Sequence, residues 1–341
     1  MSRSQVTSTV EQNTGGAVSP YVAGKNKIIN GDFGIWQRGT SGFATGGAYN
    51  ADRWKTYCDG GGGATYSVSQ QSLSAGAIAG VDTPYCWQLN QSVAGSGGTL
   101  NLLYQLIENV QTLAGQTATL SFYAKSDATR TALVPVVTQN FGSGGSSNAS
   151  TTVTATASSP ANLTTSWQRF SYNVVLPSIS GKTIGTSSYV EIDIKLPINT
   201  TQTTQITGVQ LEAGSVATPF TTATGTLSGE LAACQRYYYL HVSGNTLPIC
   251  NTGNYSSTLA IGWLGFPVTM RTVPTLVAAS GSAYYSIDVG GTGLTFSAPT
   301  IGAASTTSVR LDSAVTGATV GYAGYLRTSN ASASVAFNSE L

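Results

Sequence analysis

Charged side chains are scarce in this sequence. Asp, Glu, Lys and Arg together make up 9% of its 341 residues, whereas a typical soluble domain carries about 25%. Uncharged polar residues must therefore face the water, and Ser, Thr, Asn, Gln and 40 glycines fill that role. Thr favours strands, and Gly and Asn favour turns, whereas exposed helices depend on Glu, Lys and Ala. The composition predicts an all-β chain.

The chain is long enough for about two domains, each with its own hydrophobic core. Hydrophobic residues make up 41% of it and include 17 Tyr and 5 Trp, which is enough apolar surface to offset the entropy of ordering the chain. Residues 1–25 are polar and lack an apolar period, so we expect an N-terminal arm there. Small polar residues at 223–229 predict a linker between domains at 26–222 and 230–341.

Short segments with alternating apolar residues recur between Gly-rich turns. In the segment 119–124 the apolar residues Leu120, Phe122 and Ala124 alternate with Ser121 and Tyr123. This period of two is typical of a strand with one buried face, and many such strands indicate a sandwich or jelly roll. We expect a jelly-roll β-sandwich followed by a smaller C-terminal β-sandwich.

One segment has a helical as well as a strand-like pattern. Apolar residues between Leu102 and Leu113 fall on one helical stripe, which ends at Gly115. We interpret this segment as a strand that runs into a helical turn.

Several partners are excluded by charge and hydropathy. A net charge of +1 without a Lys/Arg cluster cannot neutralise a run of phosphates, so we expect neither nucleic acid nor an anionic membrane surface as a partner. No run of 18 apolar residues and no hydrophobic signal region occur, so we expect no membrane insertion and folding in a cytosol. The four cysteines lack CxxC spacing and are expected to be buried thiols: Cys58, Cys86, Cys234 and Cys250.

Catalytic and metal-binding patterns are weak. His241 is the only histidine, so a zinc site or a Ser-His-Asp triad would have to use it, and a half-buried strand histidine is the simpler interpretation. Glu191 and Asp193 lie about 7 Å apart on one strand face, which a glycosidase pair could use, but they face solvent and lack a third partner. Calcium at Asp32 or Asp52 has no carboxylate-dense loop to support it. We expect no enzymatic activity, no cofactor and no metal.

The five tryptophans could each stack on a sugar ring, but most are expected to be core residues. Trp87 and Trp167 lie in apolar strand patterns, and Trp263 lies in the apolar segment 259–266. Because large aromatic side chains supply much of a hydrophobic core, we expect these three to be buried.

Tyrosines in Gly-, Ser- and Asn-rich surroundings are better candidates for binding. A rigid ring with a polar hydroxyl group costs little entropy to order at an interface. The candidate residues for receptor or glycan binding are Tyr49, Tyr57, Tyr255 and Tyr284.

A series of motifs resembles the carbohydrate-binding-type, galactose-binding-like jelly-roll domain of phage tail fibre proteins. The motifs are Asn30-Gly31-Asp32-Phe33 with Trp36-Gln37, Ala51-Asp52-Arg53-Trp54, Ser121-Phe122-Tyr123-Ala124-Lys125, Val209-Gln210-Leu211-Glu212-Ala213-Gly214 and Ala217-Thr218-Pro219-Phe220. The resemblance continues in Cys234-Gln235-Arg236-Tyr237-Tyr238 and in the terminal Ser339-Glu340-Leu341. Within these motifs we expect structural roles for Arg53, paired with a neighbouring Asp or carbonyl group, and for Glu212.

The resemblance implies a homotrimeric fibre subunit of a virion that is made and assembled in the host cytoplasm. Residues 1–25 would attach to other tail or virion proteins, and the C-terminal domain would face a glycan or protein of the host surface. Residues 241–338 match no known pattern, as a variable host-specific tip would. Two alternatives stay open: a capsid decoration, head spike or neck appendage that binds no receptor, and a capsule depolymerase.

Overall fold

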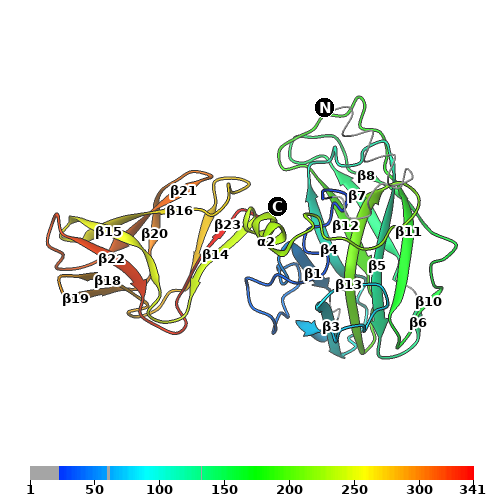
Figure 1. Ribbon diagram of the computed structural model, residues 1–341, viewed down its shortest axis with the longest axis horizontal. Helices are drawn as coiled ribbons and strands as arrows, with labels where there is room; N and C mark the ends of the chain where they lie inside the picture. Colours follow the sequence, from blue (N-terminus) through cyan, green and yellow to red (C-terminus); the bar gives the residue numbers. More distant parts are fainter. Residues whose placement is uncertain (1–22, 60–61, 132) are drawn as a thin grey trace, which may run out of the picture. The chain divides into compact units, whose positions relative to one another are not determined.

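The computed structural model describes residues 23–59, 62–131 and 133–341, so residues 1–22 of the expected arm lie outside the described residues. The chain divides into two compact units, one that ends at Glu230 and one that begins at Leu231. Almost all regular structure in both units is antiparallel β-strand (Figure 1). The expected all-β fold is therefore confirmed.

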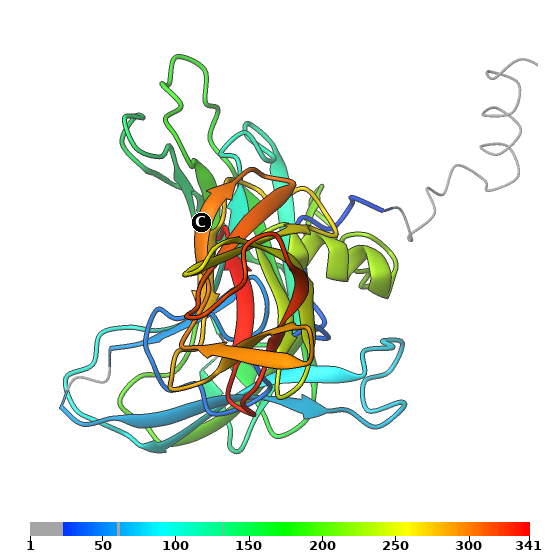
Figure 2. The same cartoon turned by 90° about the vertical axis from the view of Figure 1, so that its left-hand side faces the viewer.

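The first unit is a jelly-roll β-sandwich of a five-stranded and a six-stranded sheet (Figure 1). The five-stranded sheet runs in the order β1 (Trp54–Cys58), β4 (Asn101–Glu108), β12 (Tyr189–Lys195), β7 (Pro135–Asn140) and β8 (Ala149–Ser150). The six-stranded sheet runs in the order β2 (Thr65–Ser72), β3 (Tyr85–Val93), β13 (Gln202–Ala213), β5 (Thr117–Ser126), β11 (Gln168–Val175) and β9 (Thr152–Ala155). A small third sheet pairs β10 (Asn162–Leu163) with β6 (Arg130–Thr131). Strands β2 and β3, drawn in blue shades, run side by side in Figure 2.

The core of the first unit lies between its two large sheets. Alternation along β5 buries Leu120, Phe122 and Ala124, and Phe122 stacks on Phe170 of β11 with ring centroids 5.6 Å apart. The five-stranded sheet contributes Ile192 of β12 to the same core, and this side chain is fully buried. The period-two pattern therefore places one face of each sheet in a common core, as expected for a sandwich.

Residues of the motifs that resemble the tail fibre domain form hydrogen bonds with backbone groups of this unit. Asn30 donates from Nδ2 to the carbonyl groups of Ile35 (2.8 Å) and Asp52 (3.0 Å). Buried Arg53 donates to the carbonyl oxygen of Leu106, and Glu212 is equally buried and accepts a hydrogen bond from the Thr218 amide at 2.8 Å. The structural roles expected for Arg53 and Glu212 are confirmed.

The segment 102–115, whose sequence fits both a helix and a strand, forms a strand followed by turns. Strand β4 ends at Glu108 and is followed by consecutive turns, with backbone bonds from Thr112 to Asn109 and from Ala114 to Gln111. The prediction of a strand followed by a helical turn is confirmed.

Helix α2 (Leu227–Gln235) was not expected from the sequence, which indicated a polar linker in part of this range. Thr226 caps the helix: its carbonyl oxygen accepts from the Glu230 amide (2.9 Å), and its Oγ1 accepts from the Gly229 amide (3.1 Å). A Thr at the N-cap satisfies one of the free amides of the first turn. Small polar residues of the kind found in linkers therefore begin a helix here. Within the described ranges, no helix has the length and hydrophobicity needed to cross a bilayer.

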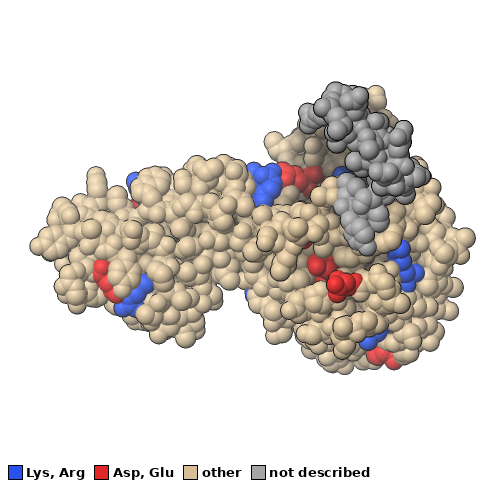
Figure 3. All heavy atoms as spheres, in the orientation of Figure 1, with Lys and Arg blue, Asp and Glu red and all other residues tan. Residues whose placement is uncertain are grey.

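The second unit has two antiparallel sheets around its own core. The three-stranded sheet runs in the order β14 (Tyr238–Ser243), β23 (Ser334–Asn338) and β17 (Thr275–Ala278). The seven-stranded sheet runs in the order β19 (Thr292–Phe296), β18 (Tyr285–Val289), β22 (Ala323–Thr328), β15 (Pro248–Ser256), β16 (Leu259–Gly265), β21 (Ser308–Ala314) and β20 (Thr300–Ala304). Figure 3 shows that charged side chains are few and scattered on the visible surface of each unit.

Candidate functional site

The outer face of the five-stranded sheet gathers tyrosines and carboxylates from three strands. Strand register aligns Lys55 of β1 with Tyr104 of β4, and Tyr104 with Asp193 of β12. Because side chains two residues apart share a sheet face, further side chains of β1 and β12 join this row. We name this surface the tyrosine–carboxylate face, and it consists of Lys55, Tyr57, Tyr104, Tyr189, Glu191 and Asp193.

Of the tyrosines expected from the sequence, Tyr57 belongs to this face and Tyr49 lies beside it, bridged to Lys55. The Lys55 ammonium group stands 5.4 Å from the ring centroid of Tyr104 and 5.0 Å from that of Tyr49. The Arg38 guanidinium group is also 5.0 Å from the Tyr49 ring, so two cations contact this ring. Tyr57 is 37% exposed. Tyr57 therefore offers a ring to a ligand, whereas Tyr49 holds Lys55 in place.

The carboxyl groups of Glu191 and Asp193 interact directly. Burial, followed by the charge of the neighbouring Glu191, raises the pKa of Asp193 to about 7, although Lys195 acts to lower it. Within the described structure, the buried Asp193 Oδ1 has no hydrogen-bond partner. Asp193 is therefore partly protonated near neutral pH, so its carboxyl group can donate as well as accept a hydrogen bond.

Neighbouring hydroxyl groups stay protonated beside this pair. Burial raises the pKa of Tyr104 to about 12, with smaller contributions from the charges of Glu191 and Asp193. Burial and the same two carboxylates also raise the pKa of Tyr189, whose hydroxyl oxygen accepts from Asn140 Nδ2 at 2.9 Å. Both tyrosines can donate hydrogen bonds over the whole neutral range.

A pocket of about 680 Å³ adjoins the tyrosine–carboxylate face. Leu102 and Lys195 line it, and they form the next cross-strand pair on the same sheet face beside the pair of Tyr104 and Asp193. Exposed apolar side chains form part of its wall, namely Leu100, Val134 and Ile198. This size and mixed lining are typical of a site for a small molecule or a short oligomer.

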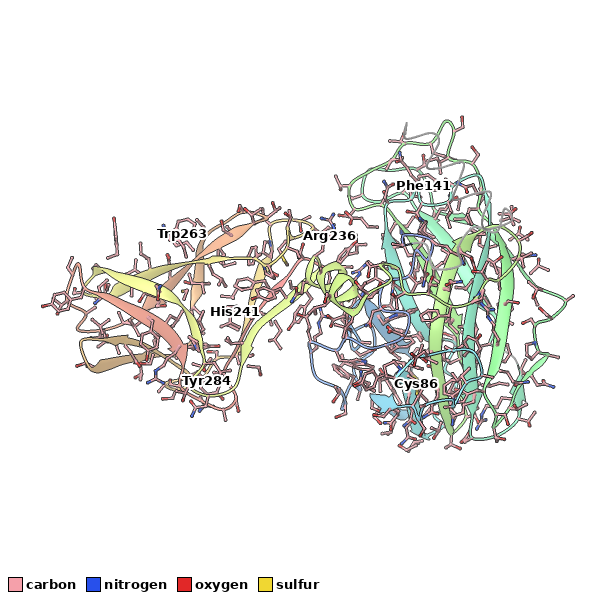
Figure 4. All side chains as sticks on the ribbon, in the orientation of Figure 1. Cys86, Phe141, Arg236, His241, Trp263 and Tyr284 are labelled. Atoms are coloured by element: carbon pink, nitrogen blue, oxygen red, sulfur yellow. The ribbon has the colours of Figure 1, made fainter. Side chains whose placement is uncertain are left out.

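The other two candidate tyrosines belong to the second unit. Tyr255 of β15 is 70% exposed. Tyr284 is half-buried and packs against the second core (Figure 4). Tyr284 therefore has less free ring surface than Tyr255.

The tryptophan predictions had mixed outcomes. Trp87 is fully buried, as expected. Trp167 is half-buried, with the Lys125 ammonium group 5.3 Å from its ring. Trp263 is 60% exposed, so the expectation that it is a core residue is wrong (Figure 4). Both faces of β16 carry apolar residues, so the sequence pattern does not show which face is buried. The small Ala260 lies on the buried face, and Trp263 lies on the opposite face.

Of the four cysteines expected to be buried thiols, Cys86 and Cys234 are buried, whereas Cys58 and Cys250 are only half-buried. Cys86 is buried and burial raises its pKa to about 12, while burial raises the pKa of the half-buried Cys250 to about 11. His241 is half-buried in β14 and contacts the Tyr239 hydroxyl through Nδ1 (2.8 Å) and the Ile249 carbonyl through Nε2 (2.9 Å). The interpretation of a half-buried strand histidine is confirmed.

Neither aspartate considered for calcium lies in a carboxylate cluster. Asp52 is buried and accepts a hydrogen bond from the Gln37 amide at 3.0 Å, and burial raises the pKa of Asp32. Across the described ranges, no group of three or more His, Cys, Asp or Glu residues is placed to hold a metal ion.

Comparison with known proteins gives structural matches alone: no family model and no curated protein sequence matches the chain. A structure described as "CBM4 structure and function" is 21% identical, with a TM-score of 0.34, and covers 55% of this chain and 99% of its own. The CBM22-1 xylan-binding domain of Paenibacillus barcinonensis Xyn10C is 12% identical, with a TM-score of 0.33 and coverage of 57% and 98%. The enzymatically active domain of bacteriophage CBA120 tailspike protein 4 is 15% identical, with a TM-score of 0.34, covering 58% of this chain and 22% of that one. No family assignment follows from these matches.

Proposed function

We propose that this chain is a glycan-binding adhesion protein whose tyrosine–carboxylate face holds a saccharide. The observation that carries the proposal is the meeting of tyrosine rings, tyrosine hydroxyl groups and two neighbouring carboxyl groups on one solvent-facing sheet beside a pocket of about 680 Å³. A saccharide needs flat apolar surface for its C–H faces and closely spaced donors and acceptors for its hydroxyl groups, and this face supplies both.

Each part of the face has a distinct role in this proposal. The exposed ring of Tyr57 packs against a sugar ring. The hydroxyl group of Tyr104 and the Asp193–Glu191 pair bind sugar hydroxyl groups as donors and acceptors. Lys55 and Lys195 balance the carboxylates, so the face suits a ligand with little net charge.

The same carboxyl pair favours binding without cleavage. Glu191 and Asp193 project from one face of the same strand, two residues apart. Glycosidase carboxyl groups instead flank the scissile bond from two sides. The proposed role is therefore binding rather than hydrolysis.

The wider biological role in this proposal is that of a phage tail fibre subunit, supported by the motif series from Asn30 to Phe220. The subunit would form a homotrimer and be carried on the virion, with residues 1–25 docked to other virion proteins. Single-site binding need be only about millimolar, or about 4 kcal/mol. Several copies would raise the avidity by roughly 10² to 10⁴.

The test of the binding site is affinity electrophoresis of the full chain in gels that each contain one soluble polysaccharide. We expect at least one polysaccharide to retard the wild type, and we expect Tyr104→Ala to weaken that retardation by about tenfold in affinity, as for an interface anchor. Tyr104→Phe, which loses the hydroxyl group alone, should have an intermediate effect.

A matched control is Tyr123→Ala. Tyr123 is a half-buried tyrosine of β5 in the other sheet, with the Arg169 guanidinium group 5.6 Å from its ring, much as Lys55 lies near Tyr104. This variant should bind as the wild type does. Equal binding by Tyr104→Ala and the wild type would overturn the assignment of the site, and release of reducing ends by the wild type would overturn the non-catalytic role.

The fibre role needs its own test on cells. Fluorescently labelled protein should bind susceptible bacteria, and pre-incubation with excess protein should slow phage adsorption to them. A protein that is found on virions but neither binds cells nor delays adsorption would instead support a capsid decoration or neck appendage.

A further inference from the structure

The outer face of the seven-stranded sheet in the second unit carries a row of aromatic and polar side chains. Strand register pairs Asp288 of β18 with Tyr325 of β22, and Tyr325 with Asn251 of β15. Continuing the Thr252–Gly262 pair by one residue places Asn251 opposite Trp263 of β16, which pairs with Arg310 of β21. The row therefore crosses five adjacent strands.

Three aromatic side chains on this face are exposed to solvent. Tyr255 is 70% exposed, Trp263 is 60% exposed and Tyr325 is 42% exposed. Their strands are neighbours in the order β22, β15, β16, so Trp263 and Tyr325 are separated by two strand spacings, or about 10 Å. We name this surface the Trp263 platform, and it consists of Asn251, Gly253, Tyr255, Trp263 and Tyr325.

No side chain covers the sheet backbone in the middle of the Trp263 platform, because a glycine lies there. Gly253 lies on the exposed face of β15, and a Cβ atom added to it would have no atom within 4 Å. The sheet backbone is therefore accessible between the rings, with the amide of Asn251 beside it. A ligand can reach this floor while its edges contact the aromatic rings.

Ion pairs border the platform on both sides. Arg310 donates to both carboxylate oxygens of Asp312, at 2.8 and 2.9 Å. On the opposite side, Asp288 accepts from Arg327 and from the Tyr325 hydroxyl group, the latter at 3.0 Å. Each border is internally neutral, and its polar groups are held in fixed directions.

These features select the chemistry of a ligand. A nucleic acid or another polyanion would need uncompensated cations, and both arginines of the borders are paired with aspartates. Large exposed rings with a polar floor and polar borders match a molecule that has apolar C–H faces and hydroxyl edges. We propose that the Trp263 platform binds a neutral saccharide chain and is a second carbohydrate site, independent of the tyrosine–carboxylate face.

The experiment uses the full chain and gels that each contain dextran, xylan, galactomannan or mixed-linkage β-glucan, with alginate as an acidic comparison. We expect Trp263→Ala to weaken binding of at least one neutral polysaccharide by about tenfold. Trp263→Tyr keeps a ring and should retain most of the binding. Gly253→Leu adds a side chain to open space and should block the floor without removing a contact.

The control variant is Val273→Ala, which shortens a 57% exposed side chain of the second unit outside its strands and should bind as the wild type does. Testing Tyr104→Ala in the same gels separates the two sites, since each proposal predicts a loss from its own variant. Unchanged binding of every polysaccharide by both Trp263→Ala and Gly253→Leu overturns the proposal, as does binding of alginate alone. A solution mass that falls on Trp263→Ala without any polysaccharide also overturns it, because a second copy of the chain then covers this face.

Discussion

Asp193 is the residue of the tyrosine–carboxylate face whose charge changes near neutral pH. Its ordinary pKa of 3.8 is raised to about 7 in the folded protein, chiefly by burial and then by Glu191. Between these two values the folded state holds a proton that the unfolded chain has released. The contribution of this group to stability is therefore present below about pH 4 and is lost as the pH rises to about 7.

Asp193→Asn removes this titration while keeping a group that can donate to Glu191. We expect the variant to match the wild type at pH 4.5 and to exceed its free energy of unfolding at pH 7.5 by about 1–2 kcal/mol, after a discount for partial solvent exposure. Urea unfolding followed by tryptophan fluorescence measures this for the first unit, which contains Trp36, Trp54, Trp87 and Trp167.

Asp82→Asn is the control, because Asp82 is an exposed aspartate of the same unit. It makes the same change at a solvent-exposed carboxyl group, so comparing the two variants isolates the effect of burial at Asp193. A pH-independent difference for Asp193→Asn would contradict the raised pKa of Asp193.

At the residue scale, the sequence indicated some parts of the candidate site and missed others. Tyr57 was recognisable because a tyrosine in polar, Gly-rich surroundings has no core to enter. Tyr104 was not, because it lies in the segment that also fits a helical stripe. Its meeting with Asp193 depends on β4 pairing with β12, strands far apart in the chain, and alternation does not encode that pairing.

Among the elements, α2 depends on a single capping residue. Replacing Thr226 by Ala removes the hydrogen bond that Oγ1 accepts from the Gly229 amide. We expect a loss of about 1 kcal/mol in the free energy of unfolding, the usual cost of losing an N-cap side chain. Differential scanning calorimetry of the full chain should show a lower melting temperature.

Ser228→Ala is the matched control for the cap. Ser228 is exposed within the same helix, and its change to Ala also removes one hydroxyl group. This variant should melt at or slightly above the wild-type temperature, because Ala has the higher helix propensity. Equal losses in both variants would mean that Thr226 does not cap α2.

Elements with strict alternation were predictable, and elements without it were not. Strand β5 follows the pattern expected from its apolar residues. Strand β15 is not recognisable from the sequence because it contains Pro248, Gly253 and several polar residues, which are rare in strands. Its hydrogen bonds with β16 and β22 hold it in the sheet despite this low propensity.

At the scale of the whole molecule, the scarcity of charge explains both the fold and the kind of ligand proposed. Strands with Ser, Thr and Asn on their outer faces remain hydrated without ion pairs. Such a surface attracts few macromolecules by charge, so contacts depend on local rings and hydroxyl groups. Individual sites of this kind bind weakly, and useful attachment then requires several copies.

Attachment through several copies has a consequence for the assembly of the chain. If the chain is a fibre subunit, its mass in solution should be three times the 35.0 kDa of one chain. Trimers also protect strand edges from unwanted pairing. Bound to cells or to a dense polysaccharide surface, the protein should dissociate roughly 10² to 10⁴ times more slowly than single-site affinity predicts. Analytical ultracentrifugation and surface plasmon resonance at high and low ligand density measure the two effects. A monomer, with dissociation independent of ligand density, would contradict the trimeric fibre and leave the two saccharide sites to act within one chain.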